Sequence, residues 1–86
     1  MIKRTLCFSN PAYLSLSNEQ LVVKVLSSEE KTATIPIEDI GVVVLDHQQI
    51  SITHGALSAL TQNNAAVITC DSKHLPIGLM MPLDGN

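Results

Sequence analysis

The chain has 86 residues, of which 45% are hydrophobic and 15% are charged, and its formal net charge at pH 7 is −3. This length excludes a second domain, and the acidic balance excludes a free-standing nucleic-acid binder with a broad basic face. No apolar run approaches the roughly 18 residues of a membrane helix, so we expect a cytoplasmic protein that does not act at a membrane.

The first half of the chain alternates strand-like runs with turn signals. Asn10 and Pro11 form a turn signal after the first run, and residues 17–19 form another after the second run. Strands joined by short turns pair antiparallel, so we expect a four-stranded meander. Pro36 has no backbone N–H to donate to a ladder, so the pairing should end there. The expected strands are residues 5–8, 13–17, 21–26 and 32–37.

The middle of the chain combines a short helical turn with an apolar strand. Ile37 and Ile40 are three residues apart, which predicts a helical turn at about 37–40 whose two isoleucines face the core. Gly41 should end this turn. The run at residues 42–45 is apolar at every position, which is typical of a central strand covered on both faces.

The last third of the chain predicts one helix among further strands. Thr53 is a good N-cap residue and predicts a helix over about 53–63. The expected strands are residues 50–52, 65–70 and 77–81. The fold class is therefore expected to be mainly β (α+β), with residues 1–82 forming the domain and 83–86 beginning a linker.

One pair of residues has the chemistry of a thiol enzyme. Cys70 and His74 are close enough in sequence for the histidine to act as the base of a reactive thiol. The structural alternative is stronger, because Cys70 ends an apolar strand and Asp71 is typical of a turn in which a carboxylate accepts backbone N–H groups. Since there is no CxxC spacing, we expect Cys7 and Cys70 to be buried, reduced thiols.

A metal site is conceivable but has no supporting spacing. Its ligands would be His47, His54, His74 and Asp71. No pair among them has the helical or short-loop spacing of recurring zinc sites, and the scattered glycines form no phosphate-binding loop. We therefore expect no catalytic, cofactor-binding or metal-binding residues in this chain.

The charges are divided unevenly along the chain. Most basic residues lie within the first 31 residues, whereas beyond them Lys73 stands alone against five acidic residues. Any DNA contact should therefore be local to the N-terminal strands or belong to another domain. The charged fraction is also below the ~25% of an average soluble domain, which predicts surface that is covered by another chain or by another part of the same protein.

Tyr13 is the side chain best suited to contact a nucleobase. It is one of two aromatic residues and follows the turn at residues 10–11, at the edge of the basic half of the chain. An exposed ring there could stack on a base, a contact of about 1 to 3 kcal/mol. The alternative is a tyrosine that packs its ring on a strand and exposes its hydroxyl group.

Three sequence blocks resemble a known family. They are Lys-Arg-Thr-Leu with Asn-Pro-Ala-Tyr-Leu-Ser-Leu at residues 3–6 and 10–16, Ile-Pro-Ile-Glu-Asp-Ile-Gly-Val-Val-Val-Leu-Asp-His at 35–47, and Ala-Val-Ile-Thr-Cys-Asp-Ser-Lys-His-Leu-Pro-Ile-Gly-Leu at 66–79. Together they resemble the N-terminal domain of the CRISPR-associated integrase of spacer acquisition, especially its type II forms. The likeness extends over residues 1–86, and the second and third blocks are its most specific parts.

The resemblance implies a small β domain of two sheets with one short helix, followed by a helical domain that carries a metal-dependent nuclease and integrase site. That site uses a glutamate, a histidine and a second acidic residue with a divalent metal such as magnesium or manganese, and none of these residues can be placed on this sequence. The chain would then be a non-catalytic domain that pairs two subunits and positions the ends of captured double-stranded DNA. A small Cas protein is a further implied partner.

The resemblance also suggests where these contacts would lie. Family members use the first turn of this domain near the duplex fork, which favours the N-terminal strands for DNA. The candidate DNA contacts are Asn10, Tyr13, Lys3 and Arg4. The candidate surface of a homodimer is the apolar last strand, at Ile77, Leu79, Met80 and Met81, with Met80 on the opposite face from the other three. A stand-alone protein-interaction module is the alternative, with a small thiol enzyme as the third.

Overall fold

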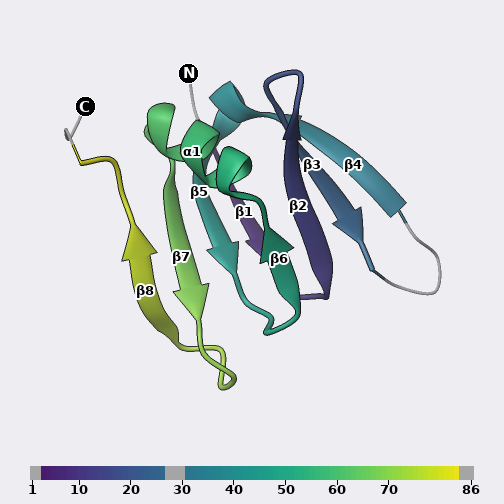
Figure 1. Ribbon diagram of the computed structural model, residues 1–86. Coiled ribbons are helices and arrows are strands. Elements are labelled where there is room, and N and C mark those ends of the chain that lie inside the picture. Colours follow the sequence, from purple (N-terminus) through teal and green to yellow (C-terminus); the bar gives the residue numbers. More distant parts are fainter. Residues whose placement is uncertain (1–2, 27–30, 84–86) are drawn as a thin grey trace.

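The computed structural model describes residues 3–26 and 31–83, which form two four-stranded sheets and one short α-helix (Figure 1). This architecture confirms the expected mainly β domain of two small sheets. Residues 84–86 of the expected linker lie outside the described residues. In chain order the elements are β1 Arg4–Phe8, β2 Ala12–Ser17, β3 Gln20–Val25, β4 Lys31–Pro36, η1 Ile37–Asp39, β5 Ile40–Leu45, β6 Ile50–Ile52, α1 His54–Gln62, β7 Ala66–Cys70 and β8 Pro76–Met80.

The first sheet is built around β5, in the strand order β1-β5-β7-β8. Both β1 and β7 run parallel to β5, while β8 is antiparallel to β7 at one edge of the sheet. Val43 pairs with Leu6 on one side and with Val67 on the other, and all three side chains are buried. The position of β5 between two strands confirms the prediction of a central strand from its apolar run.

The second sheet has the strand order β4-β3-β2-β6. Strands β2, β3 and β4 form an antiparallel meander and β6 adds parallel to β2, but β1 is absent, so the prediction of a four-stranded meander is wrong. The segment at Asn10 and Pro11 carries the chain from one sheet to the other, and the Pro11 carbonyl accepts the Leu26 N–H at 3.0 Å. β1 instead pairs with β5, where Leu6 joins the buried row of Val43.

A tight turn joins β2 to β3. Asn18 and Glu19 have φ angles of 51° and 60°, and Ser17 pairs with Gln20 across the turn. Positive φ at both central residues is typical of a two-residue type I′ hairpin, whose twist matches that of the strands. The Glu19 carbonyl accepts the Ile37 N–H at 3.1 Å, so the turn is also tied to the start of η1.

The two helical segments form where the sequence predicts them. β4 ends at Pro36, and η1 follows with Ile37 and Ile40 buried on either side of its acidic residues. The Thr53 hydroxyl oxygen caps α1 by accepting the Ala56 N–H at 3.1 Å. In the part of the chain that the structure describes, no helix is long and apolar enough to cross a membrane.

The core is a single cluster of buried side chains from both sheets and from α1, which runs from the end of β6 to the start of β7 (Figure 1). Leu14 and Leu21 from the second sheet, Val43 from the first sheet and Leu60 from α1 have no exposed surface. α1 contacts both β2 and β7, so it links one sheet to the other. Burial of side chains of this size stabilises the fold by about 1.5 to 3 kcal/mol each. Because these residues hold one face of each strand in the core, the side chains between them point away from the core.

Candidate functional site

The four candidate DNA contacts fall into two groups, one at the start of β1 and one after its end. Lys3 and Arg4 lie where β1 begins, whereas Asn10 and Tyr13 lie after its end, around the start of β2 (Figure 1). With a rise of about 3.3 Å per residue, the strand separates the two groups by on the order of 20 Å. All four residues are exposed, but the structure does not bring them together into one patch.

Lys3 already makes a structural contact. Its ammonium group donates to the Asn63 carbonyl oxygen at 3.0 Å, at the C-terminal end of α1. The partial negative charge of a helix C-terminus favours a cation at this place. Gly41 leaves room for the Lys3 stem, because a Cβ atom at position 41 would lie 3.1 Å from the Lys3 Cβ. A DNA contact by Lys3 would therefore compete with its link to α1.

Tyr13 stands on the outer face of the second sheet. It pairs in register with Lys24 of β3 and Ser51 of β6, and it is 43% exposed. The neighbouring positions on the same face include small hydroxyl side chains such as Ser15 and Thr34. The ring is thus partly exposed on a polar sheet face, an arrangement that allows stacking on a planar ligand.

The candidate dimer residues form an exposed apolar edge, which we call the β8 surface (Ile77, Leu79, Met80 and Met81). Their exposed fractions are 68%, 61%, 43% and 59%. Among the described residues β8 pairs only with β7, so its other edge carries backbone groups without strand partners. Apolar edge strands promote association and are usually covered in native proteins. The β8 surface therefore has the properties expected of a contact with another polypeptide.

The register confirms that Leu79 and Met80 face opposite sides of the first sheet. Met80 pairs with the buried Val67, while Leu79 pairs with the partly exposed Ile68. Leu79 therefore lies on the side of the first sheet that points away from the core, which we call the outer face, together with other apolar side chains that alternate along the strands with the core residues. The other members of this outer face are Val42, Val44, Ala66 and Ile68, all partly exposed. Since parallel strands are normally covered on both faces, the outer face forms one candidate contact area with Ile77 and Leu79 of the β8 surface, whereas Met80 lies on the other side of the sheet.

The Cys70 thiol is not arranged as a nucleophile. Cys70 is buried, and burial together with the nearby Asp46 carboxylate raises the pKa of its thiol. His74 Nδ1 lies 2.8 Å from Asp46 Oδ1, so the imidazole pairs with the carboxylate. A reactive cysteine needs the opposite, a lowered thiol pKa and a cationic or basic group at the sulfur. The geometry therefore disfavours the thiol enzyme considered from the sequence.

Cys7 does not have the environment expected from the sequence. Burial was expected for both cysteines, and the expectation holds for Cys70 but is wrong for Cys7, which is exposed. β1 is an edge strand of its sheet, and Cys7 lies on the opposite face from the buried Leu6. Its exposure follows from the position of β1, which the sequence pattern did not predict. Both cysteines are free thiols.

Asp71 forms the predicted turn between β7 and β8. Its Oδ1 atom accepts the backbone N–H groups of Lys73 at 2.8 Å and of Leu75 at 3.0 Å. This is the usual way in which aspartate stabilises a tight turn. The turn also places His74 beside Asp46 at the end of β5, so the histidine joins two strand ends of the first sheet.

The residues considered as metal ligands serve other purposes. His47 Nδ1 accepts the Gln49 N–H at 3.0 Å, and His54 is the first residue of α1. Asp71 and His74 are engaged in the turn and in the pair with Asp46. Within residues 3–26 and 31–83, no group of three or more histidine, cysteine or acidic side chains is placed to hold a metal ion.

Comparison with known proteins gives matches along nearly the whole chain. A family model described as "CRISPR associated protein Cas1" matches residues 6–86. The chain is also 35% identical over 82 residues to the CRISPR-associated endonuclease Cas1 of Neisseria meningitidis serogroup C (strain 8013). That match covers 95% of this chain and 26% of the Neisseria protein, so the chain spans about a quarter of the relative's length.

Solved structures share the fold at lower sequence identity. A TtCas1–DNA complex has a TM-score of 0.76 and 16% identity, over 93% of this chain and 29% of that chain. A CAS1 protein from Thermotoga maritima has a TM-score of 0.78 and 12% identity, over 93% of this chain and 24% of that chain. A partial Cas6-RT-Cas1–Cas2 complex has a TM-score of 0.78 and 18% identity, over 94% of this chain and 24% of that chain. At these identities the likeness shows the fold alone.

Proposed function

The chain belongs to the CRISPR-associated Cas1 family, and from this premise we propose that it is a non-catalytic N-terminal domain of a cytoplasmic spacer-acquisition integrase. In this role it pairs two integrase subunits and positions the ends of captured DNA. The observation that carries the proposal is the β8 surface, where three large apolar side chains are exposed on an edge strand of a Cas1-family domain and Met81 is exposed just after it.

The size of a stable interface indicates how the two copies meet. A standard interface buries about 800 Å² per partner, which is roughly a seventh of the 5617 Å² accessible surface of this chain. A five-residue strand is only about 17 Å long, so an edge contact by β8 alone is too small. We therefore propose that the homodimer interface extends from the β8 surface onto the outer face, which Leu79 connects to it through Ile68.

DNA-end positioning is assigned to the two groups of exposed residues. Tyr13 would stack on the terminal base pair with Asn10 beside it, while Arg4 and Lys3 would contact phosphates. Because these groups lie on the order of 20 Å apart, they would touch different parts of the nucleic acid. The proposal draws support from one fold relative that is a Cas1–DNA complex, and a small Cas partner is suggested by another that is a Cas1–Cas2 complex.

The chemistry of integration is assigned to protein regions beyond those matched here. The Neisseria relative is an endonuclease, and this chain matches about a quarter of its length. A divalent metal such as magnesium or manganese would act in those other regions. The raised pKa of the Cys70 thiol and the pairing of His74 with Asp46 support a structural role for the most reactive side chains of this domain.

The test of DNA-end positioning uses two duplexes of equal length. One duplex has open ends, and in the other both ends are closed by hairpin loops. Fluorescence anisotropy at one fixed salt concentration measures both affinities, since salt strongly affects DNA binding. We expect tighter binding to the open duplex, because only an open end presents a base-pair face to Tyr13. Equal affinity for the two duplexes would contradict the proposal.

Substitution of Tyr13 makes the same test specific. Loss of one stacking contact of about 1 to 3 kcal/mol corresponds to a rise in Kd of about 5- to 140-fold, which we expect for Tyr13→Ala with the open duplex. Tyr13→Phe keeps the ring and is the matched control, with nearly unchanged affinity. If Tyr13→Ala bound as tightly as Tyr13→Phe, stacking by this residue would be excluded.

A further inference from the structure

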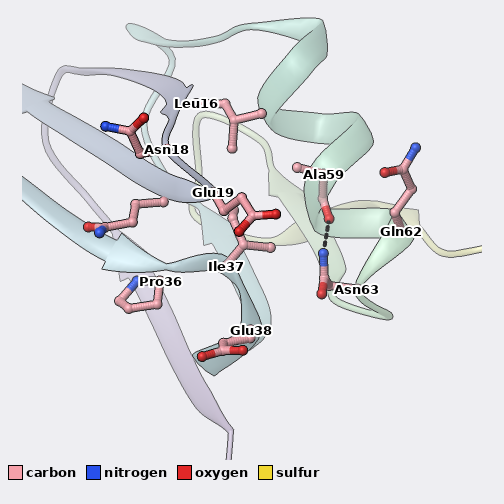
Figure 2. A pocket seen from close by; sticks show the side chains of 10 residues that line it. Leu16, Asn18, Glu19, Pro36, Ile37, Glu38, Ala59, Gln62 and Asn63 are labelled. Atoms are coloured by element: carbon pink, nitrogen blue, oxygen red, sulfur yellow. Dashed lines mark hydrogen bonds between the residues drawn. The ribbon is translucent and has the colours of Figure 1, made fainter.

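A groove lies between the β2–β3 turn, η1 and the C-terminal end of α1 (Figure 2). We call it the η1 groove, and its lining includes Leu16, Glu19, Ile37, Glu38, Ala59 and Gln62. The groove is open to solvent and has a volume of about 570 Å³, which is within the range of about 300 to 1,000 Å³ of small-ligand sites. None of the candidate DNA or dimer residues belongs to its lining, and the one link to them is the hydrogen bond from Lys3 to the carbonyl of Asn63, which does line the groove.

One wall of the η1 groove is apolar. Leu16 lies on the same face of β2 as Leu14, but Leu14 is completely buried whereas Leu16 is 40% exposed. Ala59 of α1 and the buried Ile37 of η1 complete this wall (Figure 2). An aliphatic stem laid along this wall would remove apolar surface from water on both partners.

The polar side of the η1 groove is negatively charged. Glu19 and Glu38 both line the groove and are exposed, and the Glu19 carboxylate points toward α1 (Figure 2). In the described part of the chain, neither carboxylate has an ion-pair partner. The C-terminal end of α1 adds little to this negative charge, because the Lys3 ammonium donates to the Asn63 carbonyl at 3.0 Å and offsets the partial negative charge of the helix end.

We propose that the η1 groove binds an arginine side chain of a partner protein. The aliphatic stem of the arginine would pack on Leu16 and Ala59, and its guanidinium group would pair with the Glu19 carboxylate, while Glu38 adds attraction at longer range. Arginine suits this site better than lysine, because its guanidinium is planar and more weakly hydrated. The negative rim rejects phosphate groups, so the partner is a protein segment rather than nucleic acid.

The proposal is tested by titrating the ¹⁵N-labelled chain with N-acetyl-arginine methylamide and following amide chemical shifts. N-acetyl-citrulline methylamide has the same length without the charge and is the matched control ligand. We expect saturable shifts in residues of the η1 groove with a Kd in the millimolar range, and no saturation with the citrulline compound. An equal response to both ligands, or shifts located elsewhere, would overturn the proposal.

Variants distinguish binding of arginine in the η1 groove from a general attraction of cations to the acidic chain. Glu19→Gln and Glu38→Gln keep the side-chain lengths and should each raise the Kd, with the larger effect, about fivefold or more, for Glu19→Gln. Asp39→Asn removes the same charge from η1 outside the groove lining and should change the Kd by less than about twofold at physiological salt, where charges are screened over about 8 Å. Equal effects of all three variants would overturn the proposal.

The unliganded chain provides a further control. Amide chemical shifts of the groove residues that change with protein concentration in the absence of ligand would indicate that a second copy of the chain occupies the groove, and this result would also overturn the proposal.

Discussion

Cys7 and Cys70 belong to the same sheet but have opposite surroundings, so their reactivity should differ. Cys7 is exposed, whereas Cys70 is buried and its thiol pKa is raised by burial and by Asp46. Because the thiolate is the reacting species, iodoacetamide at neutral pH should modify Cys7 faster by about tenfold or more, at a protein concentration low enough to keep the outer face, on which Cys7 pairs with Val44, free of a second copy. Peptide mass spectrometry after timed quenching measures both rates in one sample. Faster modification of Cys70 would return the thiol enzyme to consideration.

Single residues were predictable from the sequence where close neighbours decide their surroundings. Asp71 accepts two N–H groups within four residues, and Thr53 caps a helix that begins at the next residue. Both roles are local and both were predicted. The exposure of Cys7 depends on which strands flank β1, and no nearby residue specifies this. The η1 groove was missed for the same reason, since Leu16, Glu38 and Ala59 come from three elements that are distant in sequence.

Among the elements, α1 depends strongly on its cap. The Thr53 hydroxyl oxygen accepts the Ala56 N–H at 3.1 Å, and Ala56 and Leu60 are buried in the core. Thr53→Ala should therefore lower the free energy of unfolding by about 0.5 to 2 kcal/mol. Urea denaturation followed by circular dichroism measures this change. Ser51→Ala, an exposed neighbour on β6, should change the free energy of unfolding by less than about 0.5 kcal/mol. Equal stability of the two variants would show that the cap is dispensable.

The strands show where a sequence pattern is ambiguous. Turn signals and apolar runs predicted where the strands lie, because these features are local. The partner of β1 was predicted wrongly, since Asn10 and Pro11 look like a hairpin turn but connect two sheets. β1 joins the first sheet because Leu6 pairs with Val43 of the parallel strand β5, more than thirty residues further along the chain. Such pairing depends on burial in the complete core, which a linear pattern does not contain.

The edge strand β8 is the element on which pairing should depend. Placing two lysines on it, in the double variant Ile77→Lys with Leu79→Lys, puts charges on residues that are 68% and 61% exposed. The monomer should fold normally, but the dimer interface would have to bury unpaired charges, so size-exclusion chromatography should show a monomer. Thr34→Lys adds a charge to an exposed position of β4 and should leave the elution volume of the dimer unchanged. If the double variant eluted with the wild type, the interface would lie elsewhere.

In the whole molecule, the composition, the exposed apolar surface and the family all favour a domain that is covered by another polypeptide. A chain of this size hides only about 60 to 65% of the surface of its unfolded form, and here the outer face and the β8 surface add apolar area that its own core does not cover. The family was predictable from three sequence blocks, and the family model matches residues 6–86. The contact area was only partly predictable, because the outer face depends on the sheet order β1-β5-β7-β8.

If this domain pairs with a second copy of itself, its molar mass in solution depends on its concentration. Multi-angle light scattering at several micromolar concentrations should give a mass that approaches twice the 9.3 kDa of one chain as the concentration rises. A dimer that dissociates on dilution would fit the account equally well. A mass of 9.3 kDa at every concentration up to hundreds of micromolar would contradict it.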